Sequence, residues 1–182
     1  MKHLRVLLAA AIFGSASIAA LGYAAFASSV ATAATATTND AAGMIERGRY
    51  LARTSGCNDC HTPHYAETGG GVAEREWLVG SDVGWRGPWG TTYPSNLRNF
   101  VQSINADQWV TLARNAKLRP PMPWFALRDM SEYDLRALYC FIHELGPRGT
   151  SAPAWLPPGR TPQGPYIAFP DAVPASTSGA QP

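Results

Sequence analysis

The sequence contains few cysteines and almost no excess charge. Only three of its 182 residues are cysteine, so the cysteines cannot all pair within one chain. The formal net charge is +2, which gives no indication of binding to nucleic acid or to an anionic surface. The sequence also lacks a phosphate-binding glycine loop, paired carboxylates and a nucleophile beside a base. We therefore expect a protein that is not itself an enzyme.

Charged residues are also missing from positions 6–39, next to a positive start at Lys2 and Arg5. This pattern predicts a signal peptide over residues 1–27, with cleavage there or as late as residue 34. Its removal would leave 13 basic and 13 acidic residues, because two of the 15 basic residues leave with it. We expect a periplasmic protein. The alternative is an uncleaved segment that anchors the chain in the inner membrane, since the apolar stretch is about long enough to span a bilayer.

Composition divides the remaining chain into four parts. Residues 28–43 are expected to be a flexible linker, and residues 44–147 form the one globular domain that this length allows. Residues 148–171 are proline-rich, but they contain large apolar side chains that pure linkers lack. We expect them to form an extended arm that packs on the domain or on a partner, followed by a disordered tail over residues 172–182.

The most informative stretch is CNDCH, which places Cys57 and Cys60 three apart with His61 directly after them. A haem attached through both vinyl groups needs two thiols at this spacing and an imidazole that reaches the iron from the same side. A zinc site would need two further soft ligands, and a thioredoxin-like pair would need an alternating strand and helix pattern. A plain disulfide leaves His61 unexplained. The motif thus predicts one covalently attached haem c.

Three segments of the sequence resemble class I c-type cytochromes, especially the single-haem cytochrome subunits that serve periplasmic dehydrogenases. These segments are RGRYLARTSGCNDCH, GPWGTTYPSN and PPMPWFALRDMSEYDLRALYCFI, and the likeness extends over residues 46–146. It departs at LRNFVQSINADQW, where family members often have a loop rich in Gly that begins with Pro-Asp. The resemblance implies an all-α class I cytochrome c fold, with three to four helices around the haem, long irregular loops and the extended proline-rich C-terminal arm.

The resemblance also implies a role in moving single electrons between a dehydrogenase and a downstream oxidase or another cytochrome. Which residue is the second axial ligand decides whether this role is possible. We expect Met122, because the prolines of RPPMPW make a stiff loop outside any helix and the family has its distal methionine at this spacing. The other candidates are Met44, His64, Met130, interpreted as a hydrophobic staple, and His143, which falls within a helix.

Met and His ligation would keep the iron six-coordinate in both oxidation states, as an electron carrier requires. One alternative is a labile sixth site, which would suit a peroxidase or a gas sensor. Another is a structural subunit whose haem relays electrons inside a larger complex.

Three helices are predicted from capping residues and apolar periodicity. The clearest covers residues 131–145, where Ser131 and Asp134 have capping-box spacing. Others are expected over about 42–53 and 105–116, and the absence of a side chain at Gly48 would let two helices cross closely. The stretch WLVGSDVGWRGPWGTTYPSN is rich in Gly and aromatic residues, so we expect no regular structure there.

Two further predictions concern the surroundings of the haem and the third cysteine. The resemblance implies that the carbonyl of Pro88 accepts a hydrogen bond from His61. We expect half of six residues to touch the cofactor: Trp85, Arg86, Trp89, Tyr93, Asn96 and Arg119. Cys140 is expected to be a small apolar residue under the arm, or else to form a disulfide with another chain.

Overall fold

The computed structural model describes residues 40–170, so the predicted signal peptide, the C-terminal tail and most of the predicted linker lie outside the described residues. The chain divides into two compact units, and the second begins at Met44. None of the helices within residues 40–170 has the length and apolar character needed to cross a membrane.

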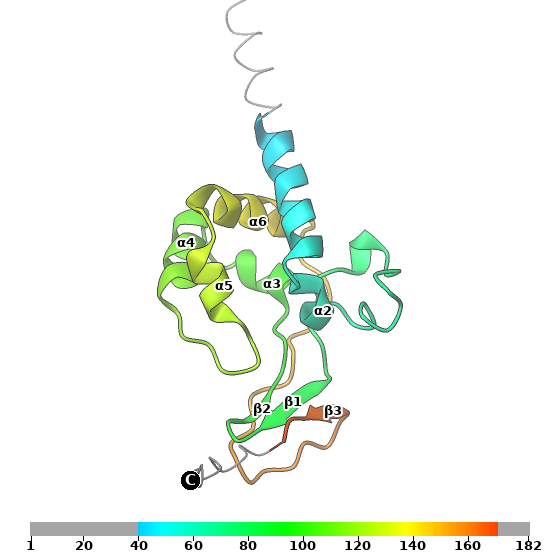
Figure 1. Cartoon of the computed structure of the whole chain (residues 1–182). Coiled ribbons are helices and arrows are strands. Elements are labelled where there is room, and N and C mark those ends of the chain that lie inside the picture. The colour runs from blue at the N-terminus through cyan, green and yellow to red at the C-terminus, as the bar shows by residue number, and fades with distance from the viewer. Residues whose placement is uncertain (1–39, 171–182) are drawn as a thin grey trace, which may run out of the picture. The chain divides into compact units, whose positions relative to one another are not determined.

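Helices are the main regular elements of the described chain, and long segments without regular structure connect them (Figure 1). A first helix reaches residue 54 and is followed by the short helix α2, Cys57–His61. The later helices are α3 (Leu97–Val101), α4 (Ala106–Asn115), α5 (Trp124–Asp129) and α6 (Glu132–Glu144), with a 3-10 turn at Glu74–Glu76. The strands are β1 (Gly84–Gly87), β2 (Gly90–Thr92) and β3 (Tyr166–Ala168).

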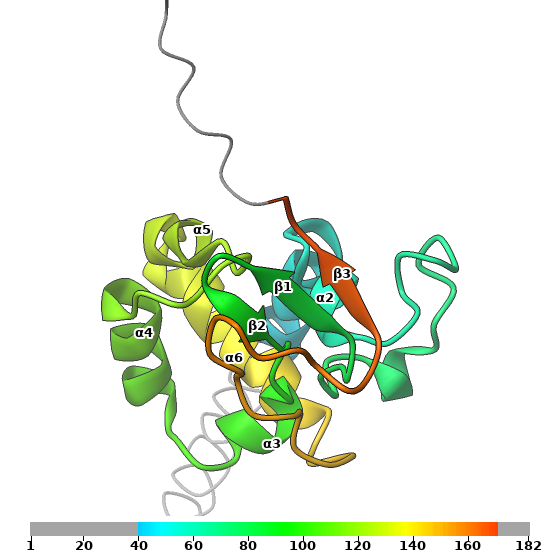
Figure 2. The same cartoon turned by 90° about the horizontal axis from the view of Figure 1, so that it is seen from below.

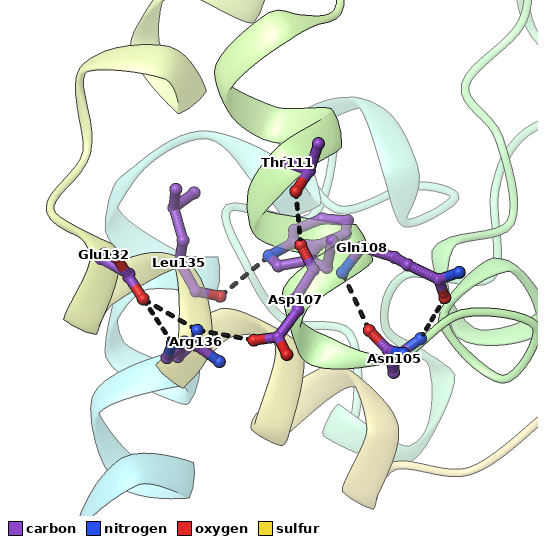
Figure 3. A network of polar contacts seen from close by, with 8 residues as sticks. Asn105, Asp107, Gln108, Thr111, Glu132, Leu135 and Arg136 are labelled. Atoms are coloured by element: carbon purple, nitrogen blue, oxygen red, sulfur yellow. Dashed lines mark hydrogen bonds and ion pairs between the residues drawn. The ribbon is translucent and has the colours of Figure 1, made fainter.

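Helix α4 confirms the prediction of a helix over 105–116. Asn105 and Gln108 form a capping box at its start, and its buried residue Trp109 donates a 2.8 Å hydrogen bond from Nε1 to the carbonyl oxygen of Leu135 in α6. On the exposed side Arg136 of α6 contacts Asp107 of α4 over 2.7 Å (Figure 3). Helices α4 and α6 are therefore joined both in the core and at the surface.

Helix α6 confirms the prediction for 131–145 and supplies much of the core. The Ser131 side chain caps it by accepting a hydrogen bond from the backbone N–H of Asp134. The Asp134 carboxylate is bound by Arg47 of the first helix, at 2.8 Å. The buried side chains of α6 are those of Leu135, Ala137, Leu138, Phe141 and Ile142.

The predicted close crossing at Gly48 is also confirmed. A Cβ atom at this position would overlap the carbonyl oxygen of Ala137 and would lie 2.6 Å from Cβ of Phe141. No side chain larger than hydrogen fits between the first helix and α6 here. The glycine thus sets how closely these two helices pack.

The prediction of an irregular loop over WLVGSDVGWRGPWGTTYPSN was wrong, because β1 and β2 form an antiparallel hairpin within it. Strand β3 from the C-terminal arm pairs in parallel with β1, with Trp85 opposite Ile167. The all-α description therefore omitted a small three-stranded sheet, ordered β2-β1-β3.

The C-terminal segment runs along this hairpin, as both Figure 1 and Figure 2 show in orange to red. Thr91 and Leu156 exchange two backbone hydrogen bonds of 2.8 and 3.0 Å, and the Phe169 ring packs against Trp85 and Trp89. The arm thus lies on the domain through both backbone and aromatic contacts.

Candidate functional site

A cavity of about 490 Å³ lies among α2, α3, α4, α5, α6 and the hairpin. Its volume is typical of a site for a small molecule or cofactor. The predicted haem residues Cys57, Cys60, His61 and Met122 all line it. The apolar part of its wall includes Leu97, Phe100, Trp109, Leu112, Leu127, Leu138 and Ile142. Residues separated by more than sixty positions in the sequence thus meet on one apolar cavity.

The ring of His61 is buried and fixed by one hydrogen bond. Its Nδ1 lies 2.7 Å from the carbonyl oxygen of Ser95. A carbonyl can only accept, so Nδ1 carries the proton and Nε2 is left with a free lone pair. Burial lowers the pKa of His61, although the Ser95 contact opposes this. The imidazole is therefore neutral at pH 7, which is the form that binds metals.

The prediction that Pro88 accepts this hydrogen bond was wrong. Pro88 is exposed in the turn between β1 and β2, and it does not line the cavity. The acceptor is Ser95, which lies between β2 and α3. The resemblance was therefore correct about the kind of contact but not about the residue that makes it.

Gly80 allows the segment that contains Ser95 to lie next to the haem motif. Its N–H donates a 2.9 Å hydrogen bond to the carbonyl oxygen of His61, and its φ of 84° is in the left-handed region. A Cβ atom there would lie 2.8 Å from the backbone nitrogen of Asn96 and 3.0 Å from the carbonyl oxygen of Pro94. Only glycine allows this approach.

A buried chain of hydrogen bonds holds helix α2 in place. The backbone N–H of Leu78 donates to Oγ1 of Thr62, and this hydroxyl donates to Oδ1 of Asn58, each over 2.8 Å. Asn58 is fully buried between the two cysteines of the motif. The sequence analysis missed this arrangement, because neither residue type has a distinctive pattern here.

Cys57 and Cys60 are free thiols that are partly buried in the cavity wall. Burial raises the pKa of the Cys57 thiol to about 11, and it also raises the pKa of Cys60. Both residues therefore remain protonated thiols at neutral pH. Cys140, which does not line the cavity, is half-buried on α6 and free in the structure.

Two methionines line the cavity. Met122 lies between α4 and α5, where its backbone N–H donates to the carbonyl of Arg119 and its carbonyl accepts from Trp124. Met130 lies between α5 and α6 and lines the same cavity, which the sequence analysis did not foresee. The other candidate ligands lie elsewhere: Met44 packs against the core, whereas His64 and His143 are exposed.

Half of the six predicted edge residues line the cavity: Trp85, Tyr93 and Arg119. The other three do not. Arg86 lies over the Tyr166 ring, Trp89 packs against Phe169, and Asn96 caps α3 while its amide donates to the carbonyls of Arg148 and Thr150.

The sequence analysis also missed Thr92 on β2. It lines the cavity, and its buried Oγ1 has no hydrogen-bond partner within residues 40–170. A buried hydroxyl normally finds a partner, so this atom is an exception in the cavity wall.

Comparison with known proteins gives distant relatives. No family model and no solved structure matches the chain. It is 28% identical over 124 residues to a subunit of nicotinate dehydrogenase from Pseudomonas putida. It is 26% identical over 125 residues to the cytochrome c subunit of alcohol dehydrogenase (quinone) from Gluconacetobacter polyoxogenes and from Komagataeibacter europaeus.

These alignments cover 62% and 68% of this chain but only 10% and 27% of the respective relatives. The chain therefore spans about a tenth to a quarter of the length of the proteins that it matches. The similarity supports a cytochrome c-like relationship with subunits of dehydrogenases.

Proposed function

We propose that the chain is a class I c-type cytochrome with one haem c, which carries single electrons. The observation that carries this proposal is the meeting of two thiols, an imidazole and a thioether on one apolar cavity. The bound haem would supply an iron that changes its oxidation state by one electron. Cys57 and Cys60 would hold the ring covalently, while His61 and Met122 would ligate the iron.

The donor set fits this cofactor. The Ser95 contact leaves Nε2 of a neutral His61 available for the metal. Arg119 is a charged residue on a largely apolar wall, as suits an apolar ring that carries a few charged substituents. The chain's own contribution is to fix the imidazole, to exclude water and to fill the sixth position.

A filled sixth coordination position on the haem iron would favour electron transfer over the alternative of a peroxidase or gas sensor. Met122 supports it, because this residue lines the same cavity as His61 and its backbone is held between α4 and α5. Met and His ligation raises the reduction potential and keeps the iron six-coordinate.

The biological setting is also a proposal. The signal peptide predicted for residues 1–27 favours a periplasmic protein, and an uncleaved segment would anchor it to the inner membrane. The relatives are subunits of dehydrogenases, which supports a dehydrogenase as the electron donor or as the complex in which this chain is a relay. The acceptor would be an oxidase or another cytochrome.

Covalent attachment is tested by counting free thiols. The full chain is produced in a host that matures c-type cytochromes, denatured and alkylated, and its mass is measured. We expect one alkyl group, on Cys140, and the added mass of one haem. Three alkylated cysteines and no haem would contradict the proposal.

The sixth ligand is tested by comparing Met122→Ala with Met130→Leu, because both residues line the cavity. We expect Met122→Ala to abolish the long-wavelength sulfur-to-iron absorption of the oxidised protein and to let carbon monoxide bind the reduced protein. Met130→Leu should leave both properties as in the wild type. Loss of the sulfur absorption in Met130→Leu alone would assign the ligand to Met130 instead. Carbon monoxide binding by the wild type would favour a gas sensor or peroxidase.

A further inference from the structure

The C-terminal arm contacts a residue that lines the cavity. Cζ of Arg119 lies 4.1 Å from the centroid of the Trp155 ring, and Arg119 is part of the cavity wall. A guanidinium within about 6 Å of an indole centroid is attracted to the face of the ring. The arm, which lies outside the predicted globular domain of residues 44–147, thus reaches the candidate haem site.

Trp155 is itself held by the hairpin. Its Nε1 donates a 3.1 Å hydrogen bond to the carbonyl oxygen of Trp89, in the turn between β1 and β2. The next residue, Leu156, exchanges two backbone hydrogen bonds with Thr91 of β2. The indole is 38% exposed, yet these contacts fix its position. The Trp155 indole therefore offers the Arg119 guanidinium a ring face whose position is already fixed.

Arg119 has no opposite charge beside it. Within residues 40–170 its side chain forms no ion pair and no hydrogen bond. Other arginines of that part of the chain do pair with carboxylates, namely Arg47, Arg49, Arg75, Arg128, Arg136 and Arg148. The donors of Arg119 are thus free, although the group is held by a ring rather than by an anion.

The arm also holds the strand that forms this part of the cavity wall. Leu156 of the arm exchanges backbone hydrogen bonds with Thr91, and the next residue, Thr92, lines the cavity while its hydroxyl oxygen is buried in the wall. A planar guanidinium such as that of Arg119 is suited to bind a carboxylate.

We propose that Trp155 is a positioning residue for Arg119, and that Arg119 binds a carboxylate substituent of the cavity's ligand. The inference rests on the proposed function, in which that ligand is a haem with two propionate groups. On this view the C-terminal arm is a structural part of the cofactor site. Its role is to keep one positive charge at a defined place beside the cofactor.

A fixed cation near the iron favours the reduced state, which carries one positive charge less. Loss of that cation, or of the ring that holds it, should therefore lower the midpoint potential. The effect through Trp155 requires Arg119 and should vanish when Arg119 is absent.

The experiment measures the midpoint potential of the full, haem-loaded chain for Trp155→Leu, Arg119→Gln and the double variant. We expect both single variants to lie below the wild type, and the double variant to equal Arg119→Gln. The matched control is Ile167→Ala, a change at an arm residue that is 47% exposed, which should leave the potential unchanged. A wild-type potential in Trp155→Leu, or full additivity in the double variant, would overturn the inference.

If Trp155→Leu does not fold, Arg119→Lys decides, because lysine keeps the charge but has no flat group to stack on the indole. We expect its potential to lie below that of the wild type but above that of Arg119→Gln, because the charge remains while its position is no longer fixed. A value equal to the wild type would show that the stacking does not matter.

The contact can also be tested by a readout other than the potential, which separates this inference from the proposed function. In the reduced, haem-loaded protein the indole N–H resonance of Trp155, assigned by its loss in Trp155→Phe, should shift in Arg119→Gln. An unshifted resonance contradicts the inference. A preparation that never acquires covalent haem in a competent host contradicts the proposed function.

Discussion

The imidazole of His61 donates from Nδ1 to the carbonyl oxygen of Ser95, which lies 34 positions later in the chain. This contact determines which ring nitrogen is free, and it depends on the close passage of the 94–96 segment over Gly80. The orientation of the His61 ring thus depends on Gly80, which makes no side-chain contact with that ring.

Gly80→Ala should lower both stability and haem retention. A non-glycine residue in the left-handed region costs about 1–3 kcal/mol, and the new Cβ would also press on Asn96 and displace Ser95. Urea unfolding and the haem-to-protein ratio measure the two effects.

The control for this change is Gly159→Ala, since Gly159 has a φ of 83° but no atom of the described part of the chain within 4 Å of the place where a Cβ would lie. It should carry the backbone cost alone and retain full haem. Equal losses at the two glycines would contradict the role given to the 94–96 segment.

Gly48→Ala should destabilise the protein, although alanine usually favours a helix. The new methyl group would meet the carbonyl of Ala137 and Cβ of Phe141, so the first helix must move away from α6. Such overpacking costs about 1–3 kcal/mol, and thermal unfolding measures it. Gly43→Ala lies in the same helix, and no atom of residues 40–170 lies within 4 Å of the place where its Cβ would be, so this change should instead gain up to about 1 kcal/mol. A gain at both positions would show that the helices are not in contact there.

Arg98→Met should be strongly destabilising. Arg98 is 5% exposed, and it donates to the carbonyl oxygens of Gly146 at 2.6 Å, Arg75 at 2.7 Å and Leu145. Its removal leaves three carbonyls without their donor, including those at the end of α6, with an expected loss of about 2–4 kcal/mol.

The same unfolding measurement on Arg53→Met provides the control, because Arg53 is exposed and makes no side-chain hydrogen bond within the described chain. A surface change of this kind should stay within about 0.5 kcal/mol. Similar losses for Arg98 and Arg53 would show that the three carbonyls find other partners.

Stability should fall in acid partly through Asp134. The hydrogen bond from Arg47, assisted by that from Ser131, lowers the pKa of this carboxyl. A lowered folded-state pKa means that the stabilisation is complete above the pKa of an unfolded Asp and is lost as the pH falls through the folded value. Asp134→Asn should therefore lose less stability than the wild type between pH 7 and about pH 3.

Urea unfolding at several pH values measures this dependence. Asp82→Asn is the matched control, since Asp82 is exposed and its carboxylate has no ion pair within residues 40–170. Its acid sensitivity should equal that of the wild type. If Asp134→Asn also behaves as the wild type, the Arg47 contact contributes nothing to folding.

The helices were predictable from the sequence because their signals are local. Ser131 accepts the capping hydrogen bond that its spacing predicted, and apolar residues recur along one face of α4 and α6. Cys57, Cys60 and His61 of the CNDCH motif line the same cavity as Met122, as expected of residues that are predicted to hold one haem. Their function as haem ligands stays a prediction.

The hairpin and the acceptor for His61 were not predictable in the same way. Gly84 and Gly90 suggested an irregular loop, but they are glycines because Thr91 and Leu156 approach them closely. Strand β3 pairs with a segment some eighty residues earlier, so no local pattern marks it. The acceptor at Ser95 is a backbone carbonyl, which every residue has. The identity of a side chain therefore cannot predict which carbonyl accepts the hydrogen bond from His61.

The pairing of β3 along β1 has a consequence for shortened forms of this protein. Without the arm, one side of β1 would present bare N–H and C=O groups, and the rings of Trp85 and Trp89 would lose the cover of Phe169. Bare strand edges beside apolar surface are where chains join into aggregates. Truncation before residue 166 would thus expose a surface that promotes aggregation. Purification tags should therefore follow the arm and should not replace it.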